Sequence, residues 1–166
     1  DARQPRDRSV IRRATIADFP QWQELGARLL ARTPYAGIPI DQRAVAAMYG
    51  QCVSSKLACC FVAEHDGKIT GTIAGVVQEL WFARRRYASD LLFVAETPGD
   101  GPKLLRAFVD WAWSVPNVAE VTCGQSSGID VQAMDGLYRW AGMRKVGAIY
   151  TIVRQAGASA CLTKSA

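Results

Sequence analysis

Residues 89–112 decide the fold, and they read SDLLFVAETPGDGPKLLRAFVDWA. The apolar run from Leu91 to Val94 is typical of a buried strand. Gly99 and Gly101 then allow a tight turn, and Pro102 suits the first position of a helix, where no amide hydrogen bond is lost. Apolar residues follow at helical spacing: Leu104, Leu105, Phe108, Val109 and Ala112. The stretch therefore predicts a strand, a glycine turn and a helix.

The chain before this stretch begins with a strand and two helices. Val10 to Ala14 is the first expected strand, and Thr15 with Asp18 resembles a capping box that opens a helix. That helix should pack one face on the core, because apolar residues recur at helical spacing: Ile16, Phe19, Trp22, Leu25, Leu29 and Leu30. After a loop with Pro34, Gly37 and Pro39, we expect a second helix over 41–52.

Two apolar, β-rich runs, 57–64 and 68–80, are separated by the polar turn 65–67 and predict a hairpin. Beyond the deciding stretch we expect a strand over 118–123, a helix over 130–141 and a closing strand or strand pair over 143–153. This order predicts an α/β fold with a single domain, in which about four helices flank a mixed central β-sheet.

The length of 166 residues fits one domain, with a basic N-terminal arm over 1–9, the folded domain over 10–155 and a flexible tail over 156–166. Apolar stretches such as Ile73 to Val77 are too short to span a bilayer, and the basic start is not followed by a secretory apolar region. We therefore expect a soluble, cytoplasmic protein that does not bind membranes.

Five cysteines and one histidine, His65, show no metal-ligand spacing, so we expect reduced thiols and no metal. The net charge of +5 comes mainly from two arginine clusters, Arg3 to Arg13 and Arg84 to Arg86. Both clusters lack interleaved aromatic residues and belong to no nucleic-acid motif, which makes nucleic acid an unlikely partner. A solvated basic surface explains them, and an anionic ligand is the alternative.

The predicted order of elements resembles the GCN5-related N-acetyltransferase (GNAT) fold, and specific segments strengthen the likeness. Residues 91–101 lie where that family has its Arg/Gln-x-x-Gly-x-Gly/Ala acyl-CoA loop. Residues 137–143, LYRWAGM, are similar to the family's LYxxxGF segment. Residues 33–35, 81–90 and 124–128 look like GNAT proteins of tailed phages and prophages. The resemblance covers Ile11 to Ile152.

The resemblance implies acetyl-CoA as co-substrate. The strand Phe93, Val94 and Ala95 would pair with the pantetheine amide like an added strand. Gly99, Asp100, Gly101 and Lys103 would offer main-chain amides to the diphosphate, with the Lys103 ammonium as a charged helper. Ser126 would bond the pantetheine or the substrate, and an ordinary turn is the alternative for it.

The resemblance also implies acyl transfer to an amine, and two catalytic residues follow. Tyr138 stands where the family's tyrosine protonates the departing CoA thiolate, although a tyrosine on an amphipathic helix also suits packing. For the base, the acidic residues expected near the centre of the sheet are Glu79 and Asp90, and Asp90, at the start of the motif strand, is the candidate. Capping the strand, or pairing with Arg84 to Arg86, is the structural alternative for its carboxylate.

The loop departs from the family pattern at Glu96, Pro98 and Asp100, which add two carboxylates and remove one amide donor. Two functions of different class therefore follow. The first is an acetyl-CoA-dependent N-acetyltransferase for a small-molecule or peptide amine. The alternative is an inactive GNAT-shaped structural or interaction protein, for example a phage virion component. A basic nucleic-acid module is a third reading.

Trp111 and Trp113 cannot share one helix face, which favours an exposed contact patch for a homo-oligomer or larger assembly.

Overall fold

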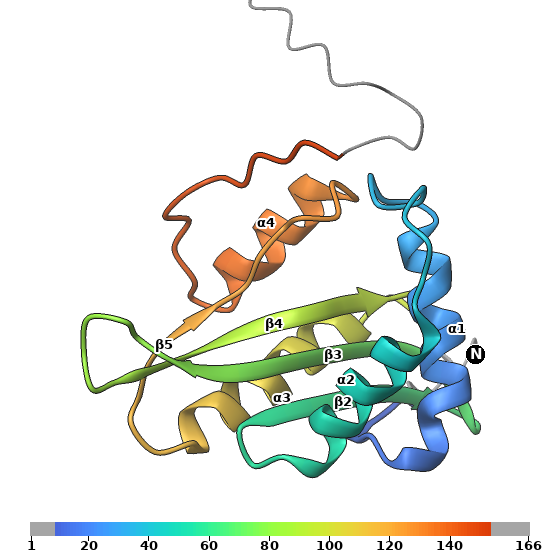
Figure 1. Ribbon diagram of the computed structural model, residues 1–166, viewed down its shortest axis with the longest axis horizontal. Helices are drawn as coiled ribbons and strands as arrows, with labels where there is room; N and C mark the ends of the chain where they lie inside the picture. Colours follow the sequence, from blue (N-terminus) through green and yellow to red (C-terminus); the bar gives the residue numbers. More distant parts are fainter. Residues whose placement is uncertain (1–8, 154–166) are drawn as a thin grey trace, which may run out of the picture.

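The computed structural model describes residues 9–153, and a five-stranded β-sheet forms its centre (Figure 1). The strand order is β1-β2-β3-β4-β5. Neighbours from β1 to β4 are antiparallel, whereas β4 and β5 are parallel, so the sheet is mixed as predicted. The strands are β1 (Val10–Arg13), β2 (Ala58–His65), β3 (Lys68–Glu79), β4 (Arg86–Ala95) and β5 (Val118–Thr122).

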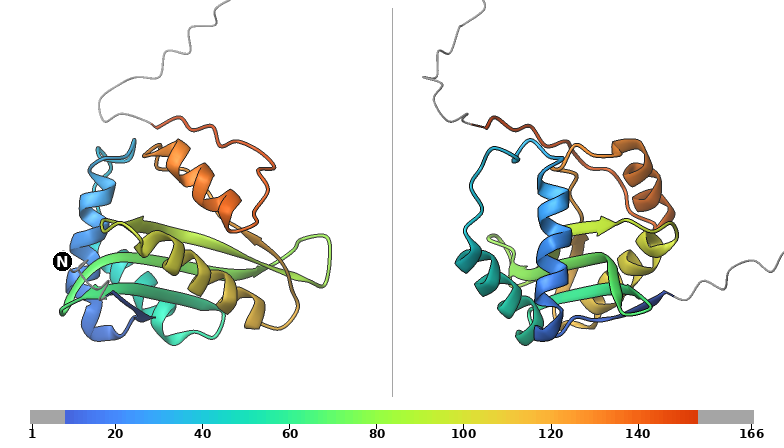
Figure 2. Two further views of the ribbon diagram at one scale, coloured as in Figure 1. Left: turned by 180° about the vertical axis from the view of Figure 1, so that it is seen from behind. Right: turned by 90° about the vertical axis from the view of Figure 1, so that its right-hand side faces the viewer.

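Helices cover both faces of this sheet. A 3-10 turn, η1 (Ile16–Asp18), leads into α1 (Phe19–Leu30), and the other helices are α2 (Gln42–Ser54), α3 (Asp100–Ser114) and α4 (Val131–Trp140). The helices α1 and α2 pack on one face, and α3 packs on the other (Figure 2). The helix α4 stands over the region where β4 and β5 separate (Figure 1).

Alternation along the central strands divides the apolar side chains between two cores. Cys59 and Ile73 point to the α3 side and pack in one cluster with Phe108. Their neighbours Cys60 and Ala74 point to the other side, where the cluster includes residues of α1 and α2. Cys59 and Cys60 are small buried side chains of the two cores, since both are at most 1% exposed. Burial raises the pKa of both thiols.

A β-bulge in β4 shapes the region of the site. Ala74 of β3 pairs with Leu92, but Gly75 pairs with Asp90, so Leu91 is the extra residue. The parallel ladder between β4 and β5 ends at Ser89, one residue before this bulge. Bulges bend a strand and increase its twist. The second half of β4 therefore leaves β5, and its edge on that side carries no ladder within residues 9–153.

Most predicted elements are confirmed, with differences at their ends. The first helix starts as a 3-10 turn, and Ile16 is 69% exposed, so its predicted place on the core face is wrong. The third helix starts at Asp100, which makes Pro102 its third residue and not its first. The amide of a third helical residue also lacks an intrahelical acceptor, so the proline is tolerated there. The proposed arm, apart from Ser9, and the tail from 156 lie outside the described residues.

The predicted closing strand over 143–153 is wrong: this segment forms no ladder. Gly142, with φ of +82°, ends α4, and the amide of Met143 donates to the carbonyl of Tyr138 at 2.9 Å. The chain then continues as an irregular segment with exposed apolar side chains: Val146, Ile149, Tyr150 and Ile152. A high β-propensity alone does not make a strand, because a strand needs a partner edge at the right register.

Among residues 9–153, no helix is long and apolar enough to cross a membrane.

Candidate functional site

The open edge of β4 is the first component of the candidate site. From Asp90 to Ala95 this strand pairs with β3 on one side only. Backbone N–H and C=O groups on an unpaired edge are available to an extended ligand, which can add to the sheet as a strand. Phe93, Val94 and Ala95, the residues predicted to hold pantetheine, all lie on this segment.

Asp90 and Tyr138, the two predicted catalytic residues, meet at the beginning of this edge. Asp90 belongs to β4, and its Oδ1 accepts the N–H of Gly124 at 2.8 Å. Tyr138 belongs to α4, and its hydroxyl donates to the carbonyl oxygen of Gly124 at 3.4 Å. One peptide segment after β5 therefore holds both side chains. The alternative pairing of Asp90 with the arginines of 84–86 is not found; Arg86 lies beside Glu79, at 3.9 Å.

The surroundings change the proton affinity of both groups. Burial raises the pKa of Asp90, although the hydrogen bond from Gly124 opposes the shift. Burial also raises the pKa of Tyr138, and the nearby Asp90 and Cys123 add to the effect. The phenol therefore stays protonated at neutral pH and can donate a proton, and Asp90 is a stronger base than an exposed carboxylate.

The β4–α3 loop forms the second component of the site. Gly99 is the N-cap of α3 with φ of +90°, a conformation in which a side chain would be strained. Helix geometry leaves the amides of Gly99 and Gly101 without an intrahelical acceptor. Lys103 is the fourth helical residue, so its amide bonds within the helix. The expectation that the Lys103 amide is available is therefore wrong, because the helix begins two residues earlier than predicted.

Both acidic residues of this loop have partners in the fold. The carboxylate of Asp100 is 1% exposed, and its Oδ2 accepts the Thr70 hydroxyl at 3.0 Å and lies 3.0 Å from Nε2 of His65. Glu96 receives two hydrogen bonds from Arg28 of α1, each of 2.9 Å. The negative charges that the sequence places in the loop are thus directed to these partners. The amide of Asp100 lies 3.3 Å from the carbonyl of Thr97.

The remaining predicted residues lie at the border of the site. The Lys103 ammonium donates to the hydroxyl of Ser9 at 2.8 Å. Ser126 is exposed on the connection between β5 and α4, where the neighbouring Ser127 hydroxyl accepts the amide of Ile129 at 3.3 Å. This bond is of the kind expected for the turn interpretation. The binding roles of Lys103 and Ser126 stay predictions.

Sequence reasoning missed three residues that the structure brings to the site: Gly124, Arg28 and His65. Gly124 acts through its backbone, for which no side chain gives a signal. Arg28 and His65 contact loop residues 68 and 35 positions away, respectively. No periodicity or motif connects such distant positions. The sequence placed His65 in the polar turn 65–67, but it is the last residue of β2 and its ring contacts the buried carboxylate of Asp100.

Residues 9–153 contain no group of three or more His, Cys, Asp or Glu side chains that could hold a metal ion.

Comparison with solved structures identifies the fold. The chain matches an aminoglycoside acetyltransferase from an uncultured soil metagenomic sample at 22% identity, with a TM-score of 0.64 over 91% of this chain and 100% of that one. It matches glucosamine-6-phosphate N-acetyltransferase from Arabidopsis thaliana at 15% identity, with a TM-score of 0.66 over 89% and 99%. A predicted acetyltransferase from Clostridium acetobutylicum, solved with acetyl-CoA, matches at 14% identity, with a TM-score of 0.65 over 87% and 96%.

The sequence matches no protein-family model and no curated protein. At these identities the structural matches establish the fold, which is that of the GNAT acetyltransferases, and they leave the chemistry to be argued from the site.

Proposed function

We propose that the chain is an acetyl-CoA-dependent N-acetyltransferase that acts on the amine of a small molecule or peptide. The observation that carries the proposal is the meeting of Asp90 and Tyr138 at Gly124, beside the open edge of β4. The acetyltransferase fold of the neighbours supports the same reaction class. One neighbour is solved with acetyl-CoA, which supports acetyl-CoA as the co-substrate.

The proposed reaction uses the two side chains in sequence. The pantetheine arm of acetyl-CoA adds to the edge of β4 along residues 93–95, which aligns the thioester with Asp90 and Tyr138. Asp90 accepts a proton from the attacking amine, directly or through water, as the new C–N bond forms. Tyr138 gives its proton to the sulfur as the C–S bond breaks. The products are the acetylated amine and the CoA thiol.

The loop departures at Glu96 and Asp100 do not oppose this proposal. Their carboxylates are engaged by Arg28, and by Thr70 and His65, respectively. Repulsion of a diphosphate by these two groups is thereby reduced. Pro98 removes one amide donor, and the start of α3 offers the amides of Gly99 and Gly101 in its place.

We further propose an acceptor that is neutral or acidic, since the exposed Arg84 and Arg85 lie on the β3–β4 loop and disfavour a cation. Trp113 is 55% exposed whereas Trp111 is 8% exposed, which supports a contact patch on α3 and a homo-oligomer. We place the enzyme in the cytoplasm, because its buried cysteines are free thiols.

The test is calorimetric titration with acetyl-CoA, followed by an acceptor screen that detects the released CoA thiol. Binding at micromolar levels corresponds to about −8 kcal/mol and, with thiol release for at least one amine, supports the proposal. Absence of acetyl-CoA binding would reject it and favour the inactive GNAT-shaped structural protein, within a phage particle or elsewhere.

A further inference from the structure

The first residue after β4, Glu96, is held by an arginine from a different element. Nε of Arg28 donates to Oε1 of Glu96 and Nη2 donates to Oε2, both at 2.9 Å. The two-pronged pair fixes the plane of the guanidinium. The backbone of Glu96 is fixed as well, because its amide donates to the carbonyl of Thr70 at 2.8 Å. Arg28 therefore has a defined orientation beside the loop.

Further cations lie near this pair. Arg28 lowers the pKa of Glu96 through its hydrogen bonds, and the charges of Lys68 and Arg32 lower it further. Glu24 is the second carboxylate that acts on Arg28. Arg28, Lys68 and Arg32 thus all act on the carboxylate of Glu96. Clustered cations favour the approach of an anion.

The pair also adjoins the start of α3. Gly99, three residues after Glu96, is the N-cap of this helix. A helix start attracts anions through its unpaired amides and its dipole. The side chains of Arg28 and Glu96 remain 48% and 39% exposed, so solvent and ligands reach them. A guanidinium has five N–H groups, and Glu96 accepts two of them.

Stability alone does not account for this arrangement. An exposed ion pair contributes about 0–1 kcal/mol, because solvent screens it and two long side chains lose freedom. A carboxylate that orients a guanidinium next to a helix start has a clearer use in binding, since orientation lowers the entropy that a ligand contact would otherwise cost.

We propose that Arg28, oriented by Glu96, binds a phosphate group of the acyl-CoA diphosphate at the start of α3. This inference rests on the proposed function. The positive charge that helps the β4–α3 loop to bind the phosphate is then the guanidinium of Arg28, which comes from α1. The carboxylate of Glu96 holds this guanidinium in its orientation.

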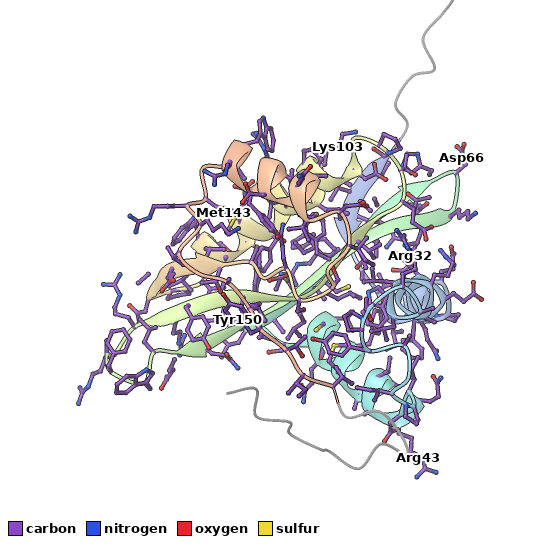
Figure 3. The ribbon with its side chains drawn as sticks, turned by 90° about the horizontal axis from the view of Figure 1, so that it is seen from above. Arg32, Arg43, Asp66, Lys103, Met143 and Tyr150 are labelled. Carbon is purple, nitrogen blue, oxygen red and sulfur yellow. The ribbon has the colours of Figure 1, made fainter. Side chains whose placement is uncertain are left out.

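The experiment measures the dissociation constant of CoA by calorimetry at low salt for the wild type and Arg28→Gln. We expect Arg28→Gln to weaken binding about tenfold, the effect of one charge-assisted hydrogen bond. Arg43→Gln is the matched control: it removes an exposed arginine from α2, on the far side of the molecule from Lys103 (Figure 3), and should leave CoA affinity unchanged. Inorganic diphosphate should compete with CoA on the wild type and more weakly on Arg28→Gln.

Circular dichroism checks whether each variant is folded. If Arg28→Gln does not fold, Arg28→Met, which keeps the apolar stem of the side chain, replaces it. Equal CoA affinity in the wild type and the Arg28 variant would overturn the inference and leave the proposed function standing. A wild type that does not bind CoA would overturn both.

Discussion

Asp90 and Tyr138 bind the two polar groups of a single residue: Gly124 donates its N–H to Asp90 and offers its carbonyl oxygen to Tyr138, at 2.8 and 3.4 Å. Asp90 comes from the bulged strand β4, and Tyr138 comes from the last helix. The connection after β5 therefore fixes the spacing of both side chains. Asp90, a proton acceptor, and Tyr138, a proton donor, thus lie at one end of the open edge of β4. The backbone of Gly124 lies between them.

The hydroxyl of Tyr138 is expected to matter for turnover and not for binding. Tyr138→Phe removes the proton donor and keeps the ring, so kcat should fall about 10²-fold or more while the dissociation constant of acetyl-CoA changes little. Thiol release with the acceptor found in the screen measures the first quantity, and calorimetry measures the second. Unchanged kcat in Tyr138→Phe would remove the tyrosine from the mechanism and leave it a packing role.

Asp90→Asn should separate activity from stability. The variant keeps an oxygen that accepts the Gly124 amide but cannot take a proton, so kcat should fall about 10²-fold. The fold raises the pKa of Asp90, which means that its ionised form is less favourable in the folded than in the unfolded chain. At neutral pH the wild type bears this cost, and Asp90→Asn does not, so the variant should melt at an equal or higher temperature.

The pH dependence of kcat gives a second test of Asp90. Because a base must be ionised, activity should rise with pH through a pKa that lies above the ordinary value of an aspartate. An activity with no decline on the acid side of neutral pH, together with normal turnover of Asp90→Asn, would be incompatible with Asp90 as the base.

Gly75 allows α3 to pack closely on the sheet. A Cβ at this position would lie 2.4 Å from Cε2 of Phe108 and 2.7 Å from the carbonyl oxygen of Ser89, which is backbone and moves little. Gly75→Ala should therefore lower the free energy of unfolding by about 1–3 kcal/mol. Gly50→Ala is the matched control, since nothing lies within 4 Å of its Cβ position. Inside α2, this change should stabilise the protein by about 0.5–1 kcal/mol. Denaturant titration measures both, and a tolerated Gly75→Ala would contradict the packing argument.

The sequence predicted the elements whose signals are local. The hairpin of β2 and β3, the strand β4 and the helix α3 each combine an apolar period with turn residues, and all are present. Val146 to Val153 has the same β-rich composition but forms no strand. Pairing depends on a partner edge that composition does not report.

The site was predictable only where a family motif covers it. Tyr138 followed from the resemblance and Asp90 from its place at the start of the motif strand, and the structure brings them together. The partners of Glu96 and Asp100 were not predictable, because Arg28 and His65 lie on separate elements. In the sequence, the carboxylates of Glu96 and Asp100 suggest that the loop repels a phosphate. In the structure, Arg28 pairs with Glu96 and His65 contacts Asp100, which reduces this repulsion.

Arg12 of β1 links the 3-10 turn η1 to strand β2, and its removal should alter stability in acid. Its guanidinium donates two hydrogen bonds of 2.8 Å to Asp18, and its Nε donates to Glu64 at 2.7 Å. These bonds to Arg12 are the main reason that the pKa of Asp18 falls from 3.8 to about 2. Arg12→Gln should lower the free energy of unfolding by about 2 kcal/mol at neutral pH.

The difference between wild type and Arg12→Gln should depend on pH in a defined direction. Between about pH 4 and 2 the unfolded chain binds a proton at residue 18 that the folded wild type does not, so wild-type stability falls as the pH drops through this window. Without Arg12 the pKa of Asp18 is nearer its ordinary value. The free energy of unfolding of the variant therefore changes less as the pH falls. The two stability curves should therefore converge toward pH 2. Arg43→Gln, at an exposed position of α2, should run parallel to the wild type at all pH values. A constant gap between the wild type and Arg12→Gln down to pH 2 would show that Arg12 stabilises through packing and not through the charge of Asp18.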